Sequence, residues 1–228
     1  MTNRQSNSYQ GMMEHYDDLL TGRKWWSRIY MRLIWNEDVN LLARKVLDFI
    51  PNDFLGRLLD VPVGTAVFTA EKYRQMKDAQ IVGLDYSEEM IAIATLRKET
   101  EEITNLSLEQ GDVGELPYAN EFFDCVLSMN GFQAFPDKEK AFAEIFCVLK
   151  PGGFFCGCFY VKGERRLADL FVKKIIERKG FFHPPYDTFT KAESRLRSMF
   201  GDDVLTETMG SACLFRCVKP QKECAESE

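Results

Sequence analysis

Three aspartates stand at the ends of short apolar segments, and their spacing suits the binding of a nucleotide-like ligand. Asp60 falls within residues 58–66, Asp85 closes residues 80–85 and Asp112 closes residues 106–112. In a parallel sheet the carboxyl ends of neighbouring strands meet at one edge, where open α/β folds bind their ligands. A carboxylate such as Asp85 can there accept hydrogen bonds from both hydroxyls of a ribose. The three segments therefore predict a ligand site built from strand ends.

The turn after the first segment consists of small residues. Gly64 lets a ligand approach the main-chain amides closely, and a helix opened by residues 65–67 would direct its positive end toward that ligand. Glycine turns after strands are common, so this turn alone also fits a purely structural junction. Asp85 has a structural alternative too, because it can serve as the N-terminal cap of a helix over residues 88–98.

The elements that must position these residues alternate between apolar strands and amphipathic helices from residue 57 to residue 160. This rhythm is typical of a parallel sheet with right-handed crossovers. Two closing strands, 203–209 and 212–218, are joined by a connection too short for a helix, so we expect the last strand to run antiparallel to its neighbour. The sequence thus predicts an α/β fold, a Rossmann-like three-layer sandwich around a seven-stranded, mostly parallel sheet with an antiparallel last strand.

Helical segments before and within this pattern are expected to cap the ligand site. Apolar spacing typical of helices runs from residue 12 to residue 50, and the insertion after the fifth strand should hold two helices, 164–178 and 191–200, around a Pro-Pro loop. We expect one domain overall. Its parts are an N-terminal helical cap segment at 1–50, a core at 51–220 with a cap insertion at 163–200, and a disordered tail at 221–228.

Composition favours a single soluble domain: 228 residues carry 45% hydrophobic and 28% charged side chains. The net charge is −6 and no run of Lys or Arg exceeds two residues, which argues against a nucleic acid partner. Seven cysteines form no paired array with metal-site spacing, so we expect reduced core thiols and no metal. Neither a signal peptide nor a long apolar span is present, which predicts a cytoplasmic protein without stable membrane insertion. A monomer and a homodimer both remain open.

Five segments, in order along the chain, resemble motifs of the class I S-adenosylmethionine-dependent methyltransferases, within the small-molecule group that includes the ubiquinone and menaquinone methyltransferases. The resemblance covers about half the chain, roughly residues 40 to 160. It implies S-adenosyl-L-methionine as the cofactor and a small molecule as the methyl acceptor. Methyl transfer from a sulfonium is an in-line displacement. The chain has 18 Phe, several of them in segments expected to surround the acceptor, and these favour an apolar or aromatic molecule. The matching segments are 59–66 for the methionine-end loop, 83–87 for the ribose site, 111–117 for the adenine site, 122–128 for the fourth strand and 144–153 for the approach to the fifth.

The resemblance also implies roles for individual residues. The turn after the fourth strand should line the acceptor site through Gly131, Phe132 and Gln133. Independently of the resemblance, His183 lies in the loop between the two insertion helices, where it could face the acceptor as the base for a hydroxyl group; it also fits a loop residue bound to backbone or water. Cofactor contacts are expected from Tyr16, Asp60, Pro62, Gly64, Thr65, Asp85, Tyr86, Met90, Asp112, Val113, Met129 and Asn130.

Two residues depart from the glycines that the family usually has. Pro62 fits only where the backbone has negative φ and needs no amide donor, and Ala66 fits where the backbone is already helical. These departures leave open a non-catalytic or regulatory protein that binds S-adenosylmethionine or a nucleotide. A NAD-type oxidoreductase is a further alternative, but it would be expected to end in another parallel βα unit rather than in a hairpin.

Overall fold

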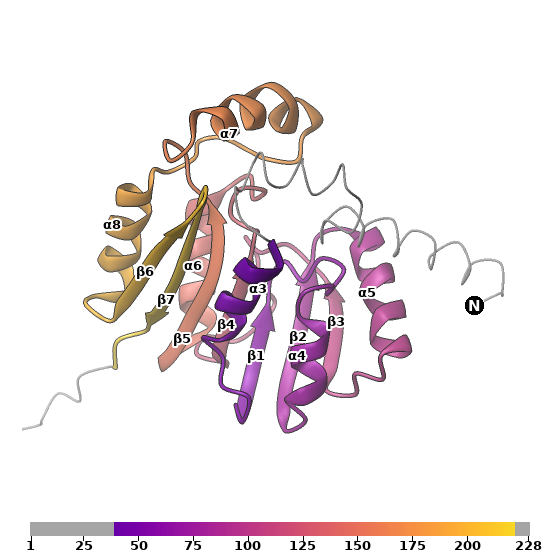
Figure 1. Cartoon of the computed structure of the whole chain (residues 1–228). Coiled ribbons are helices and arrows are strands. Elements are labelled where there is room, and N and C mark those ends of the chain that lie inside the picture. The colour runs from indigo at the N-terminus through magenta and orange to yellow at the C-terminus, as the bar shows by residue number, and fades with distance from the viewer. Residues whose placement is uncertain (1–38, 222–228) are drawn as a thin grey trace, which may run out of the picture.

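The computed structural model describes residues 39–221 of the chain, and Figure 1 shows a central sheet with helices on both sides. The strand order is β3-β2-β1-β4-β5-β7-β6. Strands β1 to β5 are mutually parallel, as expected for a Rossmann-like sheet. The strands are β1 Gly56–Asp60, β2 Ala79–Asp85, β3 Leu106–Gln110, β4 Phe123–Met129, β5 Leu149–Tyr160, β6 Val204–Met209 and β7 Ala212–Val218.

Two apolar cores, one on each face of the sheet, make the fold a three-layer sandwich. Leu58 packs on the face covered by α3 and α4, while the next residue, Leu59, packs on the face covered by α6 and α8. Successive strand side chains point to opposite faces, so both must be apolar in a strand covered on both sides. The helices are α3 Val39–Leu47, α4 Ala70–Gln75, α5 Glu88–Thr100, α6 Lys138–Val148, α7 Arg166–Phe171 and α8 Phe189–Phe200.

The chain closes with the expected hairpin. Gly210, with φ of +60°, forms the tight turn between β6 and β7. β7 pairs antiparallel with β5 and with β6, so it lies between them in the sheet. The predicted seven-stranded sheet with an antiparallel last strand is therefore confirmed.

Several helix boundaries differ from those expected, and α8 begins at Phe189 rather than at residue 191. The helix after the first turn begins at Ala70 rather than at residue 65, because Ala66 has a left-handed φ of +56° and cannot continue a right-handed helix. The expectation that Ala66 adopts helical backbone is wrong for the same reason. In the cap insertion, α7 begins at Arg166 and continues through a π-helical segment, η1 Val172–Ile176, and a 3₁₀ turn, η2 Glu177–Lys179.

Some expectations fall on residues that the structure does not describe. Tyr16 and most of the N-terminal helical segment lie outside the described residues, and so does the tail beyond residue 221. Within residues 39–221, no helix is both long enough and apolar enough to cross a membrane.

Candidate functional site at the carboxyl edge of the sheet

The predicted strand-end aspartates lie along one edge of the sheet. In the parallel register, Asp60 of β1 is opposite Gly83 of β2, and Asp85 of β2 is opposite Gln110 of β3. Asp112 follows the end of β3 by two residues. Three neighbouring strands therefore deliver carboxylates to the same edge, as their position in the sequence predicted.

A hydrogen bond joins the first turn to the end of the second strand. The Gly64 amide donates to Asp85 Oδ2 at 2.9 Å, and the Ser87 amide donates to Asp85 Oδ1 at 2.9 Å. Ser87, not Asp85, is the N-terminal cap of α5, because its hydroxyl accepts from the Met90 amide. Burial raises the pKa of Asp85, while the hydrogen bonds from Ser87 and Gly64 lower it. The carboxylate is thus oriented by two amides rather than used to start the helix.

Gly64 leaves room for a ligand beside this carboxylate. Its φ is +55°, and no atom lies within 4 Å of the place where a Cβ would stand. The neighbouring hydroxyl of Thr65 is buried and has no hydrogen-bond partner. Open space beside a glycine and an unpartnered hydroxyl fit the binding of a polar ligand at this turn.

Asp60 lies beneath the turn, with 1% of its surface exposed. Tyr73 of α4 donates its hydroxyl hydrogen bond to Asp60 Oδ2 at 2.7 Å. Burial, opposed by the hydrogen bond from Tyr73 and supported by repulsion from Asp85, raises the pKa of Asp60 to about 7. Asp60 is therefore a buried group that changes its charge near neutral pH.

The turn after β4 lies against the first turn, but it offers less surface than expected. The ring of Phe132 is 2% exposed and stacks on Phe142 at a centroid distance of 4.0 Å, within the core beneath α6. Its expected role as an acceptor wall is therefore corrected to that of a core aromatic. Gly131 is buried as well, against Pro62.

Gln133, also assigned to the acceptor site, is occupied by internal hydrogen bonds. Its Oε1 accepts from the Tyr160 amide at 3.1 Å, and its main-chain carbonyl accepts from the His183 amide at 2.8 Å. With 2% of its surface exposed, the side chain ties the end of β5 and the cap loop to the turn after β4. We therefore correct its role from acceptor contact to positioning of these elements.

His183 is brought to this edge from 50 residues farther along the chain. Its Nδ1 lies 2.9 Å from the Ala134 carbonyl oxygen. Because a carbonyl only accepts, Nδ1 donates in this contact, and in the neutral ring Nε2 is then the nitrogen with the lone pair. Lys138 adds a bond from Nζ to the His183 carbonyl at 2.5 Å. The geometry fits both predicted roles, a loop histidine bound to backbone and a base with one free nitrogen.

The other expected cofactor residues differ in exposure. Tyr86 is 77% exposed, whereas Val113 is buried. Asp112 is exposed and accepts from the Gly114 amide at Oδ1, 2.8 Å away. Met90 is half-buried at the start of α5. The remaining two, Met129 and Asn130, are half-buried at the end of β4.

Sequence reasoning missed two tyrosines, Tyr160 and Tyr186, that form an aromatic cluster with Phe182 beside these residues. Tyr160, the last residue of β5, lies 5.8 Å from Phe182 and 5.3 Å from Tyr186 between ring centroids. Its hydroxyl donates to Asp169 Oδ1 at 2.5 Å. Burial and this carboxylate raise the pKa of Tyr160. The signal in the sequence was the position of Tyr160 at a strand end, the same criterion that singled out the aspartates.

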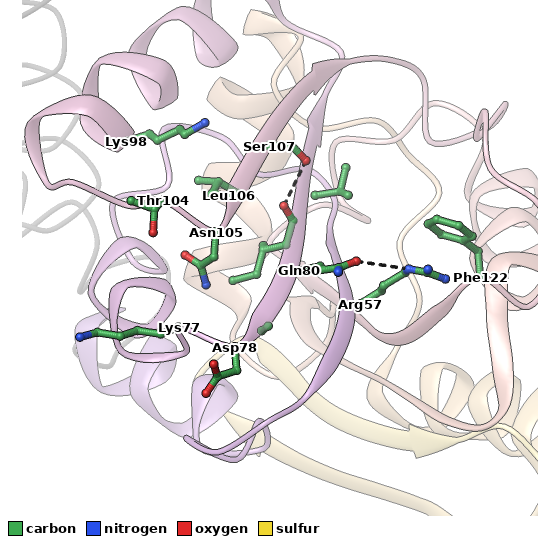
Figure 2. Close-up of a pocket in the computed structure, with 13 residues that line it drawn as sticks. Arg57, Lys77, Asp78, Gln80, Lys98, Thr104, Asn105, Leu106, Ser107 and Phe122 are labelled. Carbon is green, nitrogen blue, oxygen red and sulfur yellow. Dashed lines mark hydrogen bonds between the residues drawn. The ribbon is translucent and has the colours of Figure 1, made fainter.

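A hollow of about 690 Å³ lies at the opposite, amino edge of the sheet. Figure 2 shows the residues that line it. Here Arg57 Nε donates to Gln80 Oε1 at 3.4 Å, and the guanidinium lies 4.3 Å from the Phe122 ring centroid. Ligands of open parallel sheets bind at the carboxyl ends of the strands, so this hollow is separate from the predicted site. Within residues 39–221, no cluster of His, Cys, Asp and Glu could hold a metal ion.

Fold and strand-end geometry together define a Rossmann-like α/β protein with a ligand site at the carboxyl edge of its sheet. A family model described as a methyltransferase domain matches residues 55–183, more than half of the chain. The chain therefore belongs to the methyltransferase domain family, which confirms the resemblance identified from the sequence motifs.

Individual relatives agree with this assignment. Demethylmenaquinone methyltransferase of Deinococcus radiodurans is 35% identical over 97 residues, which cover 42% of this chain and 40% of that protein. The protein of the same name from Bacillus mycoides is 34% identical over 110 residues, 48% of this chain and 45% of that protein. The chain thus spans less than half the length of these two relatives.

Solved structures support the fold. Phosphoethanolamine N-methyltransferase 2 of Haemonchus contortus, in complex with S-adenosyl-L-methionine, matches with a TM-score of 0.67 at 19% identity. The match covers 78% of this chain and 52% of that chain. At this identity the similarity establishes the shared Rossmann-like methyltransferase fold.

Proposed function

We propose that this protein is an S-adenosyl-L-methionine-dependent methyltransferase that methylates a small apolar or aromatic molecule. The observation that carries the proposal is the hydrogen bond from Gly64 to Asp85, which joins the first turn to the second strand end beside open space. Family membership supports the reaction class. The names of the quinone-ring methyltransferases among the relatives support an aromatic acceptor, such as a quinone.

The residues present fit the cofactor. Each Asp85 oxygen accepts one amide and retains a lone pair for a ribose hydroxyl. The unpartnered Thr65 hydroxyl and the open side of Gly64 suit the polar, amino-acid end. When bound, the cofactor supplies an electrophilic methyl group on a sulfonium. The protein then has to align the acceptor with that methyl group and exclude water, and no covalent nucleophile is needed.

On the acceptor side, we assign positioning to the end of β4 and to Phe182, a cap residue that packs on the core. The half-buried Met129 and Phe182 provide apolar surface there, and the buried ring of Tyr160 packs against Phe182. We further propose that His183 Nε2 accepts the proton when the acceptor is a hydroxyl, since Nδ1 is held by the Ala134 carbonyl. Buried, unpaired cysteines within the sheet support a reducing compartment such as the cytoplasm.

A second function is favoured by one specific feature of the first turn. Ala66 adopts a left-handed φ of +56°, a conformation that costs a residue with a side chain about 1 to 2 kcal/mol. A protein that binds the cofactor without transferring its methyl group would tolerate such strain in the loop that holds the methionine end. An oxidoreductase of the NAD type is not favoured, because the sheet ends in the β6–β7 hairpin rather than in a further parallel strand.

Calorimetric titration of the full chain with S-adenosylmethionine, S-adenosylhomocysteine and NAD tests the proposal. We expect micromolar binding of the first two ligands and none of NAD. Binding should then be followed by methyl transfer to a water-soluble naphthohydroquinone, monitored by mass spectrometry. Binding without transfer to any of a panel of aromatic acceptors would favour the non-catalytic alternative, and the absence of binding would overturn both.

A further inference from the structure

Large apolar side chains are exposed on the outer surface of the cap, which is formed by residues 163–183. A helix whose outer side faces only water would carry polar side chains there. The inner side of this run is buried through Ala168, Val172 and Ile176. Eight large apolar side chains are exposed among residues 39–221, and half of them lie here, within 15 residues of one another. They are Leu167 at 66%, Leu170 at 48%, Ile175 at 39% and Phe181 at 62% exposure.

The same surface is basic, although the chain as a whole carries a net charge of −6. Residues 163–183 contain six Lys and Arg side chains but only three acidic ones. One of the acids, Asp169, accepts hydrogen bonds from the Tyr160 hydroxyl and the Gly163 amide. A local excess of cations on an acidic protein favours an anionic partner. The basic residues are Arg165, Arg166, Lys173, Lys174, Arg178 and Lys179.

The position of the cap links this surface to the site. Figure 1 shows α7 and the turns that follow it beyond the carboxyl ends of the strands. Val172 and Ile176 on the inner side of the cap belong to the same apolar cluster as Tyr160, and Met129 packs against that cluster. A partner on the outer side would thus be separated from the acceptor side of the site by one helix.

We propose that the outer surface of the cap docks onto an anionic lipid bilayer. Exposed aliphatic and aromatic side chains interspersed with Lys and Arg are the chemistry by which a helix binds at a membrane interface, with its apolar groups at the acyl boundary and its cations at anionic headgroups. The net negative charge of the remainder of the chain would repel the bilayer, so the protein would bind with the cap facing it. An apolar acceptor dissolved in the bilayer would then meet the protein at its site, a consequence that rests on the proposed function, whereas docking does not.

Other occupants fit this surface less well. In a two-fold dimer the cap would meet itself, so its cations would oppose the cations of the second copy. A nucleic acid would pair with the cations but would leave the apolar side chains of Leu167, Leu170 and Phe181 exposed to water. A bilayer satisfies both kinds of side chain at once.

Cosedimentation of the full chain with vesicles, in the absence of cofactor, tests the docking. We expect binding to phosphatidylcholine vesicles that contain phosphatidylglycerol, weak binding to phosphatidylcholine alone, and release as NaCl is raised. Two double variants probe the cap: Lys173→Glu with Lys174→Glu, and Leu170→Ser with Phe181→Ser. Each should weaken vesicle binding by roughly ten-fold or more. The matched control is Lys77→Glu with Leu205→Ser, which alters an exposed cation and an exposed apolar residue away from the cap.

Further measurements distinguish docking from unfolding and from dimer formation. Thermal unfolding should show that all variants remain folded, and methylation of a water-soluble acceptor should be unchanged in the cap variants. Equal vesicle binding by wild type and cap variants would overturn the proposal. So would a wild-type dimer, seen by sedimentation velocity without lipid, that the cap variants convert to monomer. Failure of the proposed function would abolish methylation but leave vesicle binding intact.

Discussion

Pro62 lies directly against the backbone of Gly131. A Cβ at Gly131 would stand 2.4 Å from Pro62 Cδ and 2.6 Å from Phe135 Cζ. The first turn and the turn after β4 are therefore fitted to each other across the carboxyl edge of the sheet. The room for the ring of Pro62 exists because residue 131 has no side chain.

This fit predicts that Gly131→Ala destabilises the protein. The added methyl group would overpack the contact and cost about 1 to 3 kcal/mol in the free energy of unfolding, measured by urea denaturation. Gly180→Ala is the control, because no atom lies within 4 Å of its Cβ position although its φ is +74°. An alanine at 131 that costs no more than the alanine at 180 would contradict the contact.

Asp85→Ala should weaken the binding of S-adenosylhomocysteine by about 1 to 3 kcal/mol, because ribose hydrogen bonds are lost. Asp85→Asn tests the charge separately, since its single acceptor oxygen can still take one of the amide bonds. Calorimetry would measure the change. The control is Asp78→Ala, which removes an exposed carboxylate just before the other end of the same strand. Unchanged affinity in a folded Asp85→Ala protein would refute the ribose assignment.

The raised pKa of Asp60 predicts a pH-dependent stability. A carboxyl of the unfolded chain titrates near 3.8, whereas Asp60 in the fold titrates near 7. Between these values the folded state holds a proton that the unfolded state releases, so stability falls as pH rises. Relative to Asp60→Asn, which does not titrate, the wild type should lose about 2 to 3 kcal/mol between pH 5 and pH 7.

Urea denaturation of both ligand-free proteins at the two pH values would measure this difference. A constant difference in the free energy of unfolding between wild type and Asp60→Asn would show that Asp60 is ionised throughout. In that case the bond from Tyr73 would outweigh the effect of burial.

His183→Ala should separate catalysis from cofactor binding. We expect affinity for S-adenosylhomocysteine to change little, because the ring is bound at the turn after β4 and not at the first turn. Turnover with a hydroxyl acceptor should fall by roughly ten-fold or more. The loss should be greatest at low pH, because there the hydroxyl of the acceptor is still protonated and needs a base. His183→Gln retains a polar side chain without a base of suitable pKa. Equal turnover by the three proteins would leave the histidine with only its bond to the Ala134 carbonyl.

The sequence predicted the sheet and its ligand edge because local chemistry determines both. Apolar runs ending in Asp60 and Asp85 identify strands whose ends must meet in a parallel sheet, and a two-residue connection at Gly210 requires an antiparallel pair. Those inferences need only the order of residues and the geometry of strands.

Features that depend on packing could not be predicted in the same way. Phe132 follows a strand end, as an acceptor residue would, but its ring stacks on Phe142, which lies ten residues farther along on α6. Ala66 adopts a left-handed backbone that its residue type disfavours. The hydrogen bonds of Gln133 join three segments, and no local pattern indicates which strand end will approach which loop.

The place of β7 between β5 and β6 has a consequence for how the protein is made. Until residues 212–218 leave the ribosome, β5 has no partner on that side and β6 has none on the side it shares with β7. Both nascent strands then present open edges that could pair with other chains. Protection from aggregation during synthesis therefore depends on residues 212–218, the last strand translated among the described elements. A chain truncated before this segment would contain a β6 strand that lacks its partner.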